Sequence, residues 1–266
     1  MPGMNRFLLN MLLAAALLTG CDAFDRAAME EYEAATKRWN EGDYRAAVAM
    51  YDSIAMNHPF SPRADNALYW AGVTRFLYLG ETERGLQTLR LLLKRYPRRD
   101  MAAQAQYTIA QIYELGYNDY ERAAAEYRRG AEYADREVRE KSLYGLADNL
   151  FRLGKVGEAC DTWLRQVEEF PRGPNAELAY YRLGTASFTK GAIDEAEAYY
   201  RKALDISTDH ELAVKTKFSL AGCLEAREDL TGALKLYKEI AAVYPNREAI
   251  DIKIKALETR IIKKSY

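Results

Sequence analysis

The sequence is poor in the residues that most often carry chemistry. It holds two histidines, His58 and His210, and three cysteines. Neither histidine stands beside a matching nucleophile or carboxylate, and no Cys-x-x-Cys, His-Glu-x-x-His or phosphate-loop motif occurs. We interpret both histidines as solvated turn residues between helices. We therefore expect no catalytic residue, no metal site and no cofactor, and the chain is predicted not to be an enzyme.

A surplus of positive charge is also missing. The 38 Lys and Arg residues face 39 Asp and Glu residues, so no excess of cations exists to displace counterions from a phosphate backbone. We therefore expect no nucleic acid partner. The basic clusters are interpreted as solvated helix faces, with contact to lipid headgroups as the alternative. These clusters are Lys94-Arg95 with Arg98-Arg99, and Arg128-Arg129.

Apolar runs long enough to span a bilayer are absent, and the longest run lies near the amino terminus. It extends from Phe7 to Leu18 after the basic residue Arg6, which predicts an export signal over residues 1–20. The ending Leu18-Thr19-Gly20-Cys21 resembles the lipobox of bacterial lipoproteins. The resemblance implies cleavage before Cys21, acylation of Cys21, and a short tether over residues 21–26. The alternative is an ordinary secretory signal in which Cys21 occurs by chance.

One helical pattern recurs six times along the rest of the chain. Each copy has a small residue, followed four positions later by a large one. Most copies have another apolar residue seven positions after the small one. Offsets of four and seven place these side chains on one face of a helix, and the small residue admits a close neighbour. Four copies have proline twelve positions after the small residue, which ends a helix. The small residues are Ala47, Gly85, Ala123, Ala159, Ala196 and Ala233, and the prolines are Pro59, Pro97, Pro171 and Pro245.

A second periodic segment precedes each of these helices and is also centred on a small residue. Glycine separates the two segments in five copies, and Glu228 takes its place in the last. Glycine readily adopts the left-handed conformation that closes a helix. Each copy is therefore predicted to be a helical hairpin, and the chain an all-α protein. The first-segment small residues are Ala35, Gly72, Ala110, Ala147, Gly184 and Ala221, and the turn glycines are Gly42, Gly80, Gly116, Gly154 and Gly191.

These copies resemble the tetratricopeptide repeat. Its Leu-Gly pair is matched by Leu183-Gly184, and its second-helix small residue and aromatic are matched by Ala196 and Tyr200. The resemblance implies a solenoid of helical hairpins. Successive small positions are 36 to 38 residues apart, which is longer than the family's period and predicts longer turns between the repeats. The predicted repeats span residues 27–62, 63–100, 101–137, 138–174, 175–210 and 211–246.

After the last repeat, residues 247–266 are predicted to form an amphipathic helix that caps the array, with a coiled coil as the alternative. Its apolar positions are Ile250, Ile254, Leu257 and Ile261. Two cysteines lie within the repeats, Cys160 and Cys223, about two repeats apart. We expect no disulfide between them, because such a bond needs closely spaced Cα atoms, and we interpret each as a small buried apolar residue.

Aromatic residues recur at two places on the first helix of the repeats. One place lies three residues before the small residue and the other four residues after it, so the two share a helix face. In the repeat family this face looks into the concave groove, which implies an aromatic strip that binds an extended or helical peptide. The alternative is that the rings pack between neighbouring helices. The candidate groove residues are Tyr69, Phe76, Tyr107, Tyr144, Phe151, Tyr181 and Phe188, of which Tyr69, Phe76, Tyr181 and Phe188 are expected to be the most exposed.

The first repeat contains Trp39-Asn40-Glu41-Gly42-Asp43-Tyr44 and His58-Pro59-Phe60-Ser61-Pro62. With the short tether from Cys21, it resembles the BamD family of outer-membrane assembly lipoproteins. The resemblance implies a lipid-anchored scaffold that faces the periplasm and binds barrel-assembly proteins. Asp22 resembles a signal for retention in the inner membrane, so that membrane stays open beside the outer one. Two other functions stay open, a Tol-Pal-associated or cell-division scaffold and a peptidoglycan or glycan binder.

Overall fold

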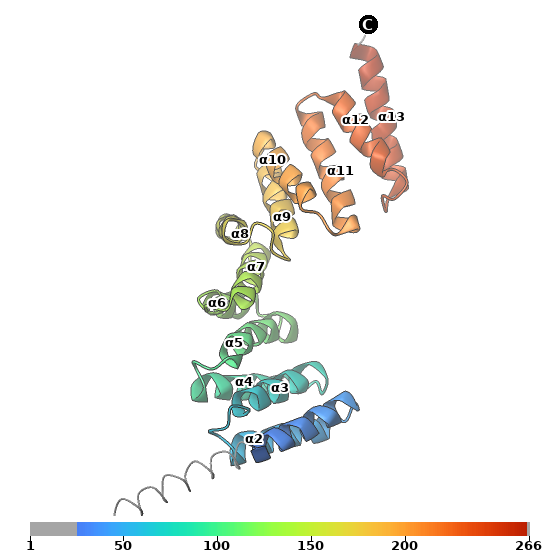
Figure 1. The fold of residues 1–266 in the computed structure, drawn as a ribbon. Helices are drawn as coiled ribbons and strands as arrows, with labels where there is room; N and C mark the ends of the chain where they lie inside the picture. Colours follow the sequence, from blue (N-terminus) through green and yellow to red (C-terminus); the bar gives the residue numbers. More distant parts are fainter. Residues whose placement is uncertain (1–25, 265–266) are drawn as a thin grey trace, which may run out of the picture. The chain divides into compact units, whose positions relative to one another are not determined.

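The computed structural model describes residues 26–264, which form helices joined by short turns (Figure 1). The chain divides into two units after Tyr133. Within the described residues there is no β-strand, so the predicted all-α fold is confirmed. Unit 1 consists of a helix over residues 26–40, α2 (Tyr44–Asn57), α3 (Ala64–Leu77), α4 (Thr82–Arg95), α5 (Met101–Gln111), the π-helix η1 (Ile112–Gly116) and α6 (Tyr120–Gly130). Unit 2 consists of α7 (Arg136–Arg152), α8 (Val156–Glu169), α9 (Ala176–Thr189), α10 (Ile193–Asp205), α11 (His210–Ala226), α12 (Leu230–Ile240) and α13 (Arg247–Lys264).

The helices of each unit pack in chain order. From α2 onward in unit 1, and from α7 onward in unit 2, each helix contacts the next. The first helices of neighbouring repeats also meet, α3 with α5 in unit 1 and α9 with α11 in unit 2. Each hairpin therefore covers the apolar face of the one before it, which is the packing of a helical solenoid.

The predicted small residues lie at the closest helix contacts. All twelve of them are buried. The contact between α3 and α4 is one example, because a Cβ added at Gly85 would lie 2.9 Å from the carbonyl oxygen of Gly72 and 3.2 Å from the backbone nitrogen of Phe76. The large residues four positions later are buried as well, and they form the core with these small positions. They are Tyr51, Leu89, Tyr127, Trp163, Tyr200 and Tyr237.

The predicted turn glycines are confirmed in four hairpins and wrong in one. Gly42, Gly80, Gly154 and Gly191 have positive φ angles. Gly116 instead ends η1, and Asn118 takes the left-handed conformation with φ 53°. Ala110 and Ala123 are 13 residues apart, one more than in four of the other hairpins; Gly72 and Gly85 have the same spacing, but no π-helix forms between them. The π-helix accommodates such an insertion by widening one helical turn. In the last hairpin, Glu228 adopts φ 62°.

The predicted proline stops hold for three of the four helices. α2, α4 and α8 each end two residues before a proline. α12 is the exception, because it ends at Ile240, and a turn closed by the bond from the Tyr244 amide to the Ile240 carbonyl precedes Pro245.

The predicted capping helix is α13, which packs against α12. Ile250 and Leu257 are fully buried beside Tyr237 and Ile240, and Ile254 and Ile261 are partly buried against the same cluster. Charged contacts add to this packing, because the Glu228 carboxylate accepts hydrogen bonds from Arg260 and Lys264. The apolar stripe of this helix therefore closes the end of unit 2.

Cys160 and Cys223 are both free thiols, and the predicted burial is wrong for Cys160, which is only partly buried. Cys223 is buried, and this burial raises the pKa of its thiol to about 11. Residues 26–264 contain no helix that is both long and apolar enough to cross a membrane. The predicted signal, the lipidation site Cys21 and Asp22 lie outside the described residues.

Candidate partner-binding surface

In four repeats, the aromatic residue that precedes the small residue of the first helix packs on the second helix of its own repeat. The ring lies beside the buried aromatic residue of that helix, and in each case the outer ring is only partly buried. These contacts support the packing interpretation for this half of the predicted strip. The ring centroids are 5.6 Å apart for Tyr32–Tyr51, 5.6 Å for Tyr107–Tyr127, 5.9 Å for Tyr181–Tyr200 and 5.3 Å for Phe218–Tyr237.

The rings that follow the small residue are more accessible. Phe151 is 38% exposed and Phe188 is 39% exposed. Phe151 lies 5.7 Å from the buried ring of Trp163, and the Arg182 guanidinium lies 5.8 Å above its centroid. Phe76 is partly buried where α3, α4 and η1 meet. Tyr69 and Tyr144 are partly buried too, so each of the seven predicted groove residues leaves part of its ring to solvent.

A denser aromatic cluster lies in unit 1, around Trp39. The Trp39 ring contacts Tyr44 at 5.8 Å, Trp70 at 5.8 Å and Tyr78 at 5.4 Å between centroids. Tyr44 and Tyr78 are themselves 4.5 Å apart, and Tyr69 extends the cluster through Trp70. The indole nitrogen of Trp39 donates a 3.0 Å hydrogen bond to the Thr74 hydroxyl, so its polar atom is satisfied inside the protein.

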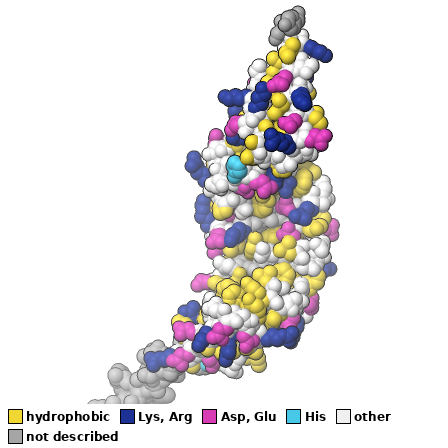
Figure 2. All heavy atoms as spheres, turned by 90° about the vertical axis from the view of Figure 1, so that its right-hand side faces the viewer, with side chains coloured by type: hydrophobic (Ala, Val, Ile, Leu, Met, Phe, Trp, Pro, Cys, Tyr) yellow, Lys and Arg dark blue, Asp and Glu magenta, His cyan; other side chains and the backbone are white. Residues whose placement is uncertain are grey.

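Exposed hydrophobic side chains continue this cluster along the edge where the hairpins of unit 1 turn. Leu77 is 60% exposed, Tyr78 45%, Leu115 63% and Tyr117 41%. Figure 2 faces this edge and shows hydrophobic side chains gathered on it. A contiguous exposed apolar patch on a folded protein marks an interaction site. We call this surface the aromatic edge and define it as Trp39, Tyr44, Trp70, Leu77, Tyr78, Leu115 and Tyr117.

Polar contacts fix the aromatic edge in place. The Tyr117 hydroxyl donates a 2.7 Å hydrogen bond to the Glu83 carboxylate, and this bond raises the pKa of Tyr117 to about 12. The buried Arg75 guanidinium donates to Asp52 at 2.5 Å and to Thr88 at 2.9 Å, which ties α3 to α2 and α4. These hydrogen bonds therefore connect the helices that carry the aromatic edge.

Sequence reasoning included Tyr69 and Phe76 in the candidate strip but missed the exposed members of the aromatic edge. Leu77 and Tyr78 directly precede the turn at Gly80, and Leu115 and Tyr117 flank Gly116. Apolar residues beside a turn glycine are a usable signal, because turns normally carry polar residues.

The histidine interpretation was wrong for His58 and correct for His210 only in its exposure to solvent. His58 caps α2 and is buried, and its Nε2 lies 3.3 Å from a Glu31 carboxylate oxygen. The helix over residues 26–40 packs against the loop that holds His58 and contributes to its burial. His210 is exposed, but it is the first residue of α11 and so belongs to a helix. Over residues 26–264, no group of three or more His, Cys, Asp or Glu side chains is arranged to hold a metal ion.

Comparison with protein families agrees with this architecture. Tetratricopeptide repeat models match residues 66–98 and 144–211. These two stretches are thus similar to tetratricopeptide repeats, and both lie inside the predicted array. The tetratricopeptide repeats indicate a protein-interaction scaffold.

PilF and PilW are among the solved structures that share the fold. PilF from Pseudomonas aeruginosa has a TM-score of 0.61 and 13% sequence identity, covering 90% of this chain and 99% of its own. PilW, described as a type IV pilus biogenesis factor, has a TM-score of 0.55 and 14% identity, covering 87% of this chain and 98% of its own. At these identities the likeness concerns the fold alone.

Two curated relatives match part of the sequence. Both are described as probable biofilm formation methyltransferase WspC, from Pseudomonas putida and Pseudomonas aeruginosa. The first is 35% identical over 99 residues, which is 37% of this chain, and the second is 36% identical over 106 residues, which is 38% of it. The chain spans 22% and 23% of the length of these relatives.

Proposed function

We propose that this protein is a non-enzymatic, lipid-anchored scaffold of the bacterial cell envelope that holds a protein partner on its aromatic edge. The observation that carries the proposal is the exposure of Leu77, Tyr78 and Leu115 on a braced cluster of rings. Aromatic side chains provide large contact areas and dominate binding energy in protein interfaces. The accessible edges of Phe151 and Phe188 provide a second contact area, in unit 2.

The anchoring part of the proposal rests on the sequence Leu18-Thr19-Gly20-Cys21. The acyl chains on Cys21 would hold the scaffold at the membrane facing the periplasm, in the outer membrane of the cell. The similarity of the first repeat to the BamD family supports a partner from the barrel-assembly machinery.

Site-specific photo-cross-linking in the full-length protein tests the partner. A photoreactive amino acid at position 115 should cross-link one defined envelope protein. The same group at position 87, an exposed site on α4, serves as the control. A barrel-assembly protein in the adduct supports the proposed role, whereas a Tol-Pal component would move the protein to envelope maintenance. Labelling of glycan, or equal labelling from both positions, would contradict the protein-binding edge.

Mass spectrometry of the amino-terminal peptide tests the anchor separately. The purified protein should begin at Cys21 and carry acyl chains, and Cys21→Ala should release it from the membrane fraction. A peptide that keeps residues 1–20, or undiminished membrane retention of the variant at high salt, would contradict the anchor.

A further inference from the structure

The loop between α2 and α3 presents Phe60 to solvent on a fixed backbone. Phe60 is 87% exposed, more than any other large hydrophobic side chain of the described residues. Its neighbours in the loop are nevertheless held. The Tyr96 hydroxyl donates a 2.6 Å hydrogen bond to the Pro59 carbonyl, and Arg99 donates to the carbonyls of Phe60 at 3.3 Å and Ser61 at 2.6 Å. Hydrogen bonds from the loop between α4 and α5 therefore fix the backbone that carries the exposed ring.

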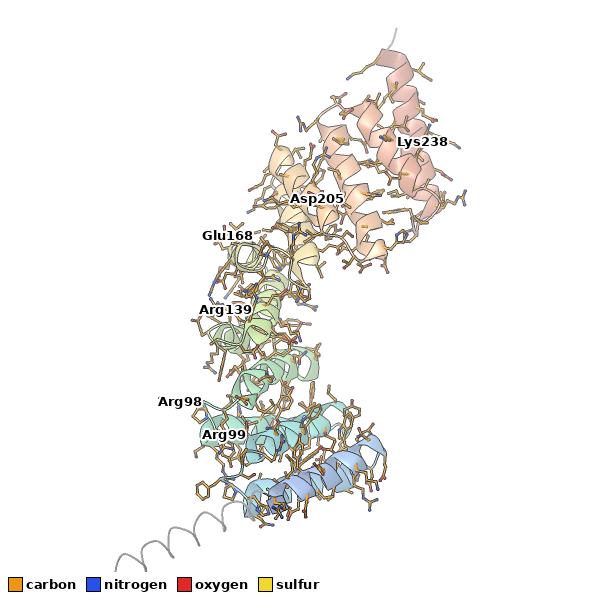
Figure 3. All side chains as sticks on the ribbon, viewed as in Figure 1. Arg98, Arg99, Arg139, Glu168, Asp205 and Lys238 are labelled. Carbon is orange, nitrogen blue, oxygen red and sulfur yellow. The ribbon has the colours of Figure 1, made fainter. Side chains whose placement is uncertain are left out.

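The surroundings of Phe60 carry positive charge. Seven residues line a hollow of about 470 Å³ here, and three of them are arginines while none is acidic. Among the described residues, Arg98 has no hydrogen-bond or ion-pair partner, and Arg95 makes one long bond, 3.5 Å, to the Ala55 carbonyl. Figure 3 shows Arg98 and Arg99 side by side on the loop before α5. We call this surface the Phe60 platform, defined as Pro59, Phe60, Arg95, Tyr96, Pro97, Arg98 and Arg99.

The platform lies at the edge of unit 1 where the described chain begins. Arg63 donates a 3.2 Å hydrogen bond to the Met29 sulfur, and Glu31 contacts His58 at 3.3 Å. Five peptide units separate Cys21 from Arg26, and a chain of that length reaches at most about 18 Å. A lipid on Cys21 would therefore keep this edge close to the bilayer surface.

We propose that the Phe60 platform rests on the surface of an anionic lipid bilayer, with the Phe60 ring among the headgroups and Arg95 and Arg98 beside lipid phosphates. The proposal deepens the proposed function, since it uses the same membrane anchor. An aromatic ring flanked by cations suits the membrane interface, where rings bury their apolar faces and cations meet anionic headgroups. The hollow's lack of acidic side chains supports an anionic occupant.

This contact would also orient the aromatic edge. Phe60 precedes α3 and Leu77 ends it, so the two surfaces lie at opposite ends of a 14-residue helix that is about 21 Å long. A platform seated on the membrane would leave the aromatic edge facing away from the lipid, accessible to a protein partner.

Photo-cross-linking to lipid tests the proposal on the purified full-length chain mixed with vesicles. The vesicles contain phosphatidylethanolamine and phosphatidylglycerol, and a parallel set contains phosphatidylcholine alone. A photoreactive amino acid at position 60 should give severalfold more lipid adduct than one at position 77, which is also exposed but lies at the other end of α3. Phosphatidylcholine vesicles and high salt should both reduce the adduct, because salt screens surface charges.

Charge variants sharpen the test. Arg98→Glu should lower the lipid adduct at position 60 severalfold, whereas Arg84→Glu, on an exposed arginine of α4, should leave it unchanged. Equal adducts from positions 60 and 77, or an adduct indifferent to lipid charge, would overturn the platform. The acylation state of Cys21, read by mass, separates the two proposals. A lipid adduct from an unacylated chain supports the platform and contradicts the anchor, and an acylated chain without the adduct contradicts the platform alone.

Discussion

The hydroxyl of Tyr96 bonds the carbonyl of Pro59 at 2.6 Å, so the loop that ends the second repeat fastens the loop that ends the first. Removing this hydroxyl by Tyr96→Phe should destabilise the protein by about 1 kcal/mol, the typical contribution of such a bond. Thermal melts monitored by circular dichroism measure the change. Tyr44→Phe is the matched control, because the Tyr44 hydroxyl has no hydrogen-bond partner among the described residues. Equal melting of the two variants would mean that the bond between the loops contributes nothing.

The contact between α3 and α4 predicts a large cost for one methyl group. A Cβ at position 85 meets backbone atoms of Gly72 and Phe76, which cannot rotate away as a side chain can. Gly85→Ala should therefore destabilise the protein by roughly 1 to 3 kcal/mol, as overpacking does. Gly157→Ala, in α8, meets no atom within 4 Å and should be neutral or stabilising by up to about 1 kcal/mol. Chemical denaturation of both variants checks the pair, and a neutral Gly85→Ala would refute the assigned helix contact.

Glu169 gives unit 2 a defined response to acid. A hydrogen bond from Arg139 at 2.7 Å, and a second from Arg165 at 2.9 Å, hold the pKa of Glu169 below its usual value. Because the pKa is lower in the folded state, the carboxylate stabilises the fold above its unfolded pKa, and this stability is lost as pH falls through the folded value.

Melting temperatures measured between about pH 6 and about pH 3 should therefore fall less steeply for Glu169→Gln than for the wild type. Glu168→Gln is the control, since Glu168 is exposed and has no ion-pair partner among the described residues. Parallel acid profiles for the wild type and Glu169→Gln would contradict the role given to this carboxylate.

The repeat architecture could be predicted because one physical requirement recurs in every copy. Two helices of a hairpin approach closely only where small residues face each other, so positions such as Ala196 and Gly184 fix the helix register from sequence. The π-helix could not be predicted, because the extra residue between Ala110 and Ala123 also occurs between Gly72 and Gly85, where no π-helix forms.

The candidate surface was harder to predict than the fold. Helical periodicity selects residues on one face, and it therefore selected Tyr107 and Tyr181, which rest on buried rings. The exposure of Leu77 and Leu115 depends on how consecutive hairpin turns line up in space. That alignment is set by packing between repeats. The spacing of residues within one repeat does not predict it.

The central claim is that the aromatic edge holds the protein partner. The most direct test replaces Leu77 and Leu115 together by Glu. It then measures how much of the partner identified by cross-linking still co-purifies with the protein. Both side chains are more than half exposed, so the melting temperature should stay near that of the wild type, because exposed substitutions change stability by about 0.5 kcal/mol or less. The matched variant Phe151→Ala with Phe188→Ala reports on the second area, in unit 2. The account predicts that the double Glu variant loses the partner and melts normally, and full retention of the partner by this variant would contradict it.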